Sequence, residues 1–230
     1  MTRPAERRGA GGAGRPGGPA PRGPASRGAA SRGAASRGAA PAKVRIIGGD
    51  WKRTPLAVVD APGLRPTPDR VRETLFNWLG QRLDGWRCLD LYAGTGALGL
   101  EAASRGAAKV VLVEREPRAV QALRDAQARL KADRVEIVQA DATAWLGSAR
   151  DRFDLVFLDP PFGGDALGRV LPRVVERVEP GGFVYVESDR ALAPDAAPLA
   201  ALPGVELRRA DKAGQVHYHL LHLPPRPPGA

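Results

Sequence analysis

The spacing of apolar residues changes repeatedly along the chain, and each change predicts a different element. Short and mostly apolar runs, typical of buried parallel strands, lie at 87–92, 109–114, 134–139, 153–158 and 182–187. Stretches with helical spacing lie between them at 97–105, 117–131 and 165–178. Strands separated by helices predict an α/β fold with a mostly parallel sheet and helices on both faces.

Two further patterns flank this alternation. Residues 44–59 predict two short strands around a turn at Gly48 and Gly49. A helix is predicted up to Gly80, because Pro68 lies near its first turn and apolar residues then recur every four positions. Near the C-terminus, strands at 205–210 and 215–222 are joined by the sequence DKAGQ. They predict an antiparallel hairpin at one edge of the sheet.

Charge is distributed unevenly along the 230 residues. Residues 1–43 contain eight arginines and one lysine against a single glutamate, a net charge of +8, so that most of the chain's +10 lies there. This segment repeats SRGAA three times and has no large apolar residue after Met1, which predicts a disordered basic tail. It is either a loose electrostatic tether to RNA or an extension without a selected role. Residues 44–230 are expected to form one domain.

Cysteine, histidine and hydropathy narrow the class of protein. The single cysteine, Cys88, excludes an internal disulfide framework, and its place in an apolar strand predicts a packed thiol in a reducing cytoplasm. The chain has no apolar run long enough to cross a membrane and no secretory signal, so a soluble cytoplasmic protein is expected. His217, His219 and His222 could suggest a metal site, but histidines on a solvated strand are the preferred interpretation.

Carboxylates recur where the predicted strands end. Glu114, Asp141 and Asp159 lie at or just after consecutive strand ends, and Asp90 lies within the first strand of the alternation. Ligands of such sheets bind at the carboxyl ends of the strands, near the switch in strand order. A structural role is the alternative for each acid, and Asp141 in particular precedes ATAWL as a helix N-cap would.

A glycine-rich stretch follows Asp90. Gly94 and Gly96 let the backbone approach a ligand closely, and the spelling GTGALG also fits a dinucleotide-binding fingerprint with Glu114 twenty residues on. Asp90 separates the two interpretations, because a carboxylate repels a pyrophosphate and attracts the ammonium and sulfonium of S-adenosylmethionine. In either case Glu114 can accept bonds from ribose hydroxyls, and Asp141 can accept one from an adenine amine.

The strand at 153–158 ends in Asp159-Pro160-Pro161-Phe162. Consecutive prolines stiffen the backbone and remove two N–H donors, which leaves the Asp159 carboxylate and the proline carbonyls as acceptors without local partners. A stiff turn after a buried strand is the simpler alternative.

These motifs together resemble a known family. DLYAGTGALGLEAASRGA, VLVERE, ADA and LDPPF are similar to class I S-adenosylmethionine-dependent methyltransferases that methylate amines. RIIGGDWKRTPL, GLRPTPDRVRETLFNWL and KAGQVHYHL resemble, more narrowly, the bacterial 16S ribosomal RNA guanine-N2 methyltransferases. The resemblance runs from about residue 44 to 222. It implies a Rossmann-like methyltransferase fold, S-adenosylmethionine as cofactor, no metal, and 16S ribosomal RNA or a small-subunit particle as partner of a monomeric enzyme.

The resemblance also suggests roles for single residues. Asp159 and the Pro160 carbonyl would hold the two N–H groups of the target amine, and Phe162 would stack on the base beside Pro161. Further cofactor contacts are expected from Tyr92, Thr67 and Arg70, and substrate contacts are expected from Arg65, Arg45, Lys52 and Arg53. Helix capping and solvated surface charge are the alternatives for these N-terminal residues.

Two rival functions remain at this stage. A nicotinamide oxidoreductase would explain the glycine-rich stretch and Glu114, but it leaves Asp90 and the Asp159 motif without a role. A catalytically silent RNA-binding assembly factor would retain the fold without the reaction.

Overall fold

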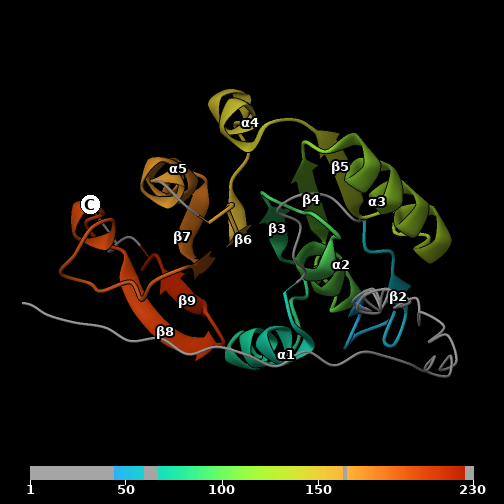
Figure 1. The fold of residues 1–230 in the computed structure, drawn as a ribbon, viewed down its shortest axis with the longest axis horizontal. Helices are drawn as coiled ribbons and strands as arrows, with labels where there is room; N and C mark the ends of the chain where they lie inside the picture. Colours follow the sequence, from blue (N-terminus) through green and yellow to red (C-terminus); the bar gives the residue numbers. More distant parts are fainter. Residues whose placement is uncertain (1–43, 60–66, 163–164, 226–230) are drawn as a thin grey trace, which may run out of the picture. The chain divides into compact units, whose positions relative to one another are not determined.

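A computed structural model of the chain describes residues 44–59, 67–162 and 165–225, and all of them belong to one compact unit. The predicted basic tail, residues 1–43, lies outside the described residues. A seven-stranded sheet in the order β5-β4-β3-β6-β7-β9-β8 forms the centre of this unit (Figure 1). The α/β fold expected from the sequence is therefore confirmed.

The parallel part of the sheet contains five strands. They are β3 (Arg87–Asp90), β4 (Lys109–Glu114), β5 (Val135–Gln139), β6 (Phe153–Leu158) and β7 (Val178–Ser188). The chain builds outward from β3 through β4 to β5, and then returns to the other side of β3 with β6 and β7. The strand order therefore reverses between β3 and β6, and this is the point where open α/β sheets bind ligands.

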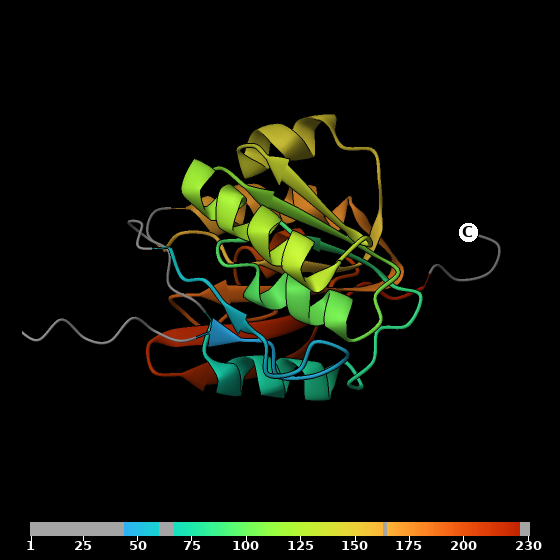
Figure 2. The same cartoon turned by 90° about the vertical axis from the view of Figure 1, so that its right-hand side faces the viewer.

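Helices cover both faces of the sheet, as Figures 1 and 2 show. One face packs against α1 (Asp69–Trp78), α2 (Ala97–Ser104) and α3 (Pro117–Leu130), and the other packs against α4 (Ala142–Ser148) and α5 (Ala166–Val175). Strand residues alternate between these two cores: Cys88 faces the first and Leu89 faces the second, both fully buried. Period-two alternation into two apolar layers explains why the central strands read as continuous apolar runs.

An antiparallel hairpin closes one edge of the sheet. Strand β9 (Val216–His222) pairs with β7, and β8 (Glu206–Ala213) pairs with β9, after a short 3₁₀ turn at Leu199–Ala201. Both strands extend through most of the DKAGQ sequence, so that only Gly214 and Gln215 form the turn. Gly214 has a φ of 62°, which a two-residue hairpin turn favours.

A buried carboxylate of α2 binds the N-terminal segment. The short antiparallel strands β1 (Val44–Arg45) and β2 (Pro55–Leu56) precede α1. Glu101 of α2 is fully buried and accepts hydrogen bonds from the backbone N–H groups of Ile47 and Gly48, both over 2.7 Å. It also accepts from the guanidinium groups of Arg72 in α1 and Arg105. Four donors from three segments therefore converge on one side chain.

Two sequence expectations need correction. Helix α4 was not predicted, although its N-cap at Asp141 was considered. The solvated-strand interpretation is wrong for His219, because this residue is only 1% exposed. Its Nε2 accepts a hydrogen bond from the Leu192 N–H at a distance of 3.0 Å. The expectation for Cys88 is confirmed, since its thiol is buried. Within the described part of the chain, no helix is long and apolar enough to cross a membrane.

Candidate active site

The two motifs at the switch in strand order lie beside each other. Strands β3 and β6 pair with Asp90 opposite Phe157, and the N–H of Leu91 donates to the Phe157 carbonyl over 3.2 Å. The glycine-rich loop therefore leaves β3 next to the point where Asp159 leaves β6. This adjacency joins the two predicted halves of one site.

The glycine loop has a backbone that other residues would strain. Gly94 and Gly96 adopt φ angles of 52° and 74°, in the left-handed region that favours glycine. A Cβ atom on Gly96 would lie 2.5 Å from Leu123 of α3. The loop therefore turns tightly into α2 and leaves its backbone open to a ligand.

Glu114, at the end of β4, stabilises this loop. Its Oε2 accepts the N–H of Gly94 over 2.8 Å, and its Oε1 accepts the N–H groups of Arg115 and Glu116, also over 2.8 Å. The side chain is largely buried, at 7% exposure. A carboxylate has about four acceptor positions, so one remains for a ligand hydroxyl while these bonds persist.

Asp90 lies beneath the loop. Its Oδ2 accepts the N–H of Gly99 in α2 over 2.9 Å, and the residue is 2% exposed. The pKa of Asp90 is raised to about 7, chiefly by burial and also by the charges of Glu114 and Glu187, while the Gly99 bond acts in the opposite direction. The charged form of this side chain is therefore disfavoured and becomes more favourable when a cation lies close to it.

Asp141 follows β5 and Tyr92 follows β3, so the two residues lie on either side of the end of β4. Asp141 Oδ1 accepts the N–H groups of Thr143 and Ala144 over 2.9 and 3.0 Å, so the N-cap considered for it is real. Its second oxygen makes no hydrogen bond to the described residues and can accept from a ligand amine. Tyr92 is half-buried, and burial followed by the charge of Asp141 raises its pKa.

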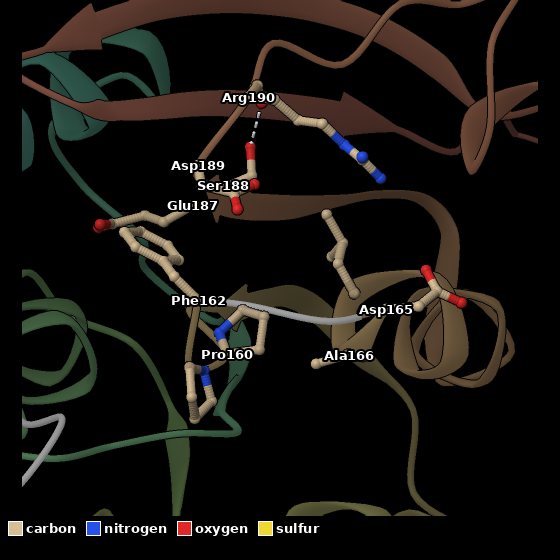
Figure 3. A pocket seen from close by; sticks show the side chains of 10 residues that line it. Pro160, Phe162, Asp165, Ala166, Glu187, Ser188, Asp189 and Arg190 are labelled. Atoms are coloured by element: carbon tan, nitrogen blue, oxygen red, sulfur yellow. Dashed lines mark hydrogen bonds between the residues drawn. The ribbon is translucent and has the colours of Figure 1, made fainter.

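The Asp159 motif forms one wall of a pocket. Pro160, Pro161 and Phe162 line it together with the start of α5 and the end of β7 (Figure 3). Phe162 is 50% exposed, and within the described ranges no other large apolar side chain is exposed. An aromatic ring left at the mouth of a pocket can stack on a planar ligand.

Asp159 itself remains available. Neither its carboxylate nor the Pro160 carbonyl makes a hydrogen bond to a residue in the described ranges. Burial raises the pKa of Asp159 well above its ordinary value, and the negative charges of Glu187 and Asp90 raise it further. Two acceptors therefore lie together without partners, as the sequence predicts.

Glu187 is a site residue that the sequence did not reveal. It lies near the end of β7, lines the same pocket and is 3% exposed. Its Oε1 accepts hydrogen bonds from the hydroxyl groups of Thr67, over 2.8 Å, and Tyr185, over 2.9 Å. Burial raises the pKa of Glu187, while these two bonds lower it. Thr67 is therefore at the site through Glu187, whereas its cofactor contact stays a prediction.

The other predicted N-terminal residues are spread over the surface. Arg45 pairs with Asp69 over 3.1 Å, and exposed Arg70 lies near Asp211, whose pKa it helps to lower after the stronger effect of the Tyr218 hydrogen bond. Arg65 lies outside the described residues. Neither Arg45 nor Arg70 makes a hydrogen bond or ion pair to the glycine loop in the described part of the chain, and the ligand roles of all three arginines stay predictions.

Lys52 and Arg53 lie at the opposite end of α2 from the glycine loop. Their turn packs on the last turn of that helix, where the N–H of Trp51 donates to Ser104 Oγ over 2.9 Å. Eight helical residues span about 12 Å, so a contact there requires an extended partner.

The site as a whole is acidic. Asp90, Glu114, Asp141, Asp159 and Glu187 all lie at the carboxyl edge of the sheet. Such an arrangement disfavours a diphosphate and favours a ligand with positive charge, together with a donor group that faces Asp159. The described residues contain no group of three or more ligating side chains able to hold a metal ion.

Comparisons with known proteins agree with this geometry. The family model described as "Conserved hypothetical protein 95" matches residues 44–222. Ribosomal RNA small subunit methyltransferase D of Escherichia coli (strain K12) is 41% identical over 185 residues, 77% of this chain and 89% of that protein. The protein of the same description from Haemophilus influenzae is 38% identical over 157 residues, 66% of this chain and 81% of that protein. The solved structure of Escherichia coli yhhF matches with a TM-score of 0.70 at 38% identity, covering 80% of this chain and 100% of that chain.

Proposed function

Because this chain belongs to the family described as conserved hypothetical protein 95, we propose that it transfers a methyl group from S-adenosylmethionine to the N2 amine of a guanine in small-subunit ribosomal RNA. The names of the relatives from Escherichia coli and Haemophilus influenzae support an RNA substrate of this class. The observation that carries the proposal is the adjacency of the glycine loop after β3 and the unpartnered acceptors after β6.

The residues at the site fit this cofactor. S-adenosylmethionine supplies a methyl group on a positively charged sulfonium, and its ammonium adds a second positive charge. Gly94 and Gly96 allow close approach of the backbone, Glu114 has an acceptor position for a ribose hydroxyl, and the second oxygen of Asp141 suits an adenine amine. Asp90 stabilises the cationic end at short range. A dinucleotide would instead place its diphosphate among these carboxylates, which argues against the oxidoreductase alternative.

Asp159 and the Pro160 carbonyl orient the target amine for the reaction. An exocyclic amine delocalises its lone pair into the ring, so it reacts only when it is rotated and aligned. The Asp159 carboxylate and the Pro160 carbonyl accept its two N–H groups and turn the lone pair toward the methyl carbon. As the N–C bond formed and the C–S bond of bound S-adenosylmethionine broke, Asp159 would take up the proton that the nitrogen loses. The raised pKa of Asp159 makes it a better proton acceptor than an ordinary aspartate.

Phe162 offers a stacking surface for the target base. An enzyme that modifies a base must take it out of its stack, which costs a few kcal/mol. The exposed ring of Phe162 offers a new stacking partner at the edge of the pocket, and Pro161 extends the same surface. This arrangement also explains why a protein would expose a phenylalanine beside two prolines.

The domain organisation is part of the proposal. Residues 44–230 form the methyltransferase domain, in which the segment 44–80 covers the cofactor and substrate edge. Thr67 supports this role, because its bond to Glu187 holds the start of α1 at that edge. Residues 1–43 contribute a non-specific electrostatic attraction to RNA.

The direct test is methyl transfer by the full-length protein. Small-subunit RNA and particles, both lacking the modification, are incubated with radiolabelled S-adenosylmethionine, and the labelled nucleotide is mapped by mass spectrometry. We expect a single N2-methylguanine, which Asp159→Asn abolishes and the exposed matched control Asp133→Asn preserves. Label on another base, or transfer that survives in Asp159→Asn, would contradict the proposal.

A further inference from the structure

The Glu187 carboxylate is fixed in orientation in the pocket beside Phe162, where we propose that the target base binds. Two hydroxyl donors, from Thr67 and Tyr185, converge on the same oxygen, Oε1. No residue in the described ranges donates to Oε2. The carboxylate is therefore fixed in orientation with one oxygen saturated and the other available.

The position of this oxygen relates it to the target base. Glu187, Phe162 and Pro160 line the same pocket, and Figure 3 shows the Glu187 side chain and the Phe162 ring extending in the same direction. The strand register relates Glu187 to Asp159, because Leu158 of β6 pairs with Val186 of β7 and the next residue along each strand is Asp159 and Glu187, respectively. A base stacked on Phe162 with its amine at Asp159 would thus present the neighbouring atom of its edge to Glu187.

In guanine that neighbouring atom is a donor. The ring nitrogen N1 carries a hydrogen beside the N2 amine, whereas N1 of adenine or 2-aminopurine is an acceptor. We propose that Glu187 is a specificity-determining residue that selects guanine by accepting the N1–H through Oε2. This inference rests on the proposed function, and it assigns to Glu187 the choice of base rather than the transfer of the methyl group.

Thr67 and Tyr185 contribute through Glu187. Burial raises the pKa of Glu187, and their two hydrogen bonds act against this rise by favouring the ionised carboxylate, which accepts and does not donate. An ionised carboxylate cannot form a hydrogen bond with an unprotonated N1, because both groups are acceptors and neither supplies a hydrogen. The pocket therefore rejects the wrong base by leaving two acceptors face to face.

Two base analogues test this contact. 2-Aminopurine retains the N2 amine but has an unprotonated N1 and no O6, whereas 7-deazaguanine retains the whole edge that faces Glu187. Each is placed in ligated small-subunit RNA at the guanine mapped as the methylation site. Methyl transfer is then measured for wild-type protein, Glu187→Gln and Thr67→Val.

For wild-type protein we expect guanine and 7-deazaguanine to react alike, and 2-aminopurine to lose about tenfold to a hundredfold in kcat/KM. Glutamine can donate to an unprotonated N1, so Glu187→Gln should lower transfer to guanine and raise transfer to 2-aminopurine. Their ratio should fall to one or below. Thr67→Val removes one of the two hydrogen bonds to Oε1 but retains the Glu187 side chain, so both substrates should decline and guanine should remain preferred.

Equal loss on both bases in Glu187→Gln would overturn the inference, because it would show a structural role alone. If that variant does not fold, wild-type protein decides the matter, since equal use of 2-aminopurine and guanine also overturns it. Failure of the proposed function looks different: wild-type protein would then methylate no guanine N2 in the unmodified RNA.

Discussion

The backbone N–H of Gly94 donates to Glu114 Oε2 over 2.8 Å, so the glycine loop after β3 is tied directly to the end of β4. The same carboxylate accepts two further backbone N–H groups. Any ligand hydroxyl that binds Glu114 therefore binds an acceptor whose orientation is already fixed. The loop and the proposed ribose site consequently depend on one side chain.

Glu114→Ala should weaken cofactor binding and preserve turnover. A hydrogen bond to a charged acceptor contributes about 1.5–3 kcal/mol, which corresponds to roughly a tenfold to hundredfold rise in Kd. Because three backbone donors also lose their acceptor, the melting temperature should fall as well. Calorimetric titration with S-adenosylmethionine measures the first effect, and kcat at saturating cofactor should remain close to wild type. An unchanged Kd would remove Glu114 from the cofactor site.

Turnover should depend on pH through Asp159. Burial, followed by the charges of Glu187 and Asp90, raises the pKa of this carboxyl. The form that accepts the amine N–H is ionised, so it exists above the raised pKa and is lost as pH falls through it. A profile of kcat against pH should therefore decline on its acid side, at a higher pH than an ordinary aspartate would give. A flat profile between pH 5 and 8 would be inconsistent with this role.

Phe162→Ala should weaken RNA binding while leaving cofactor affinity unchanged. Stacking of a base on an aromatic side chain is worth about 1–3 kcal/mol. Phe162→Tyr retains the ring and should have a mild effect, which makes it the matched control. RNA affinity and KM for RNA measure the difference between the two variants. Equal losses in both would indicate packing rather than stacking.

Asp90 should make the protein less stable as pH rises. Its pKa is about 7 in the folded protein against 3.8 for an unperturbed aspartate, so between these values only the folded state holds the proton. The free energy of unfolding then falls by at most about 1.4 kcal/mol per pH unit. Asp90→Asn can still accept the Gly99 N–H and never ionises, so it should flatten this slope and be relatively more stable at pH 8. Denaturant unfolding from pH 4 to 8 compares the two proteins, and parallel slopes would refute the effect.

Removal of residues 1–43 should affect RNA binding only at low salt. The segment carries +8 of the total +10 charge and no apolar anchor, so its attraction to RNA is screened as salt rises. Salt titrations of RNA affinity for full-length and shortened protein should converge beyond physiological ionic strength, while the modified nucleotide stays the same. Curves that superimpose at every salt concentration would show that the tail does not contact RNA.

The features that were predictable from sequence are those carried by local patterns. The run ending at Leu158, followed by Asp159 and two prolines, indicates both a buried strand and a stiff set of acceptors, and the structure contains both. Gly94 and Gly96 likewise indicate a backbone that a ligand can approach closely, and the structure gives both residues left-handed φ angles. Each of these inferences depends on neighbours within a few residues.

Glu187 and Arg72 could not be assigned in the same way. Glu187 ends an apolar strand and looks like a solvated terminus, because its partner Thr67 is 120 residues away. Arg72 looks like a surface charge on a helix, yet it is fully buried against Glu101. Buried charges are stable only with partners, and those partners become neighbours only after the sheet has formed.

The hydrogen bonds of Glu101 limit local unfolding of the N-terminal segment. Since it binds Ile47, Gly48, Arg72 and Arg105 at once, the N-terminal strands cannot detach without leaving a buried carboxylate short of donors. The amides of Ile47 and Gly48 should accordingly exchange with solvent deuterium as slowly as those of α2, although they lie in the loop between two strands of only two residues each. The N-terminal strands thus belong to the same cooperative unit as the sheet, and they are not an independently fraying arm.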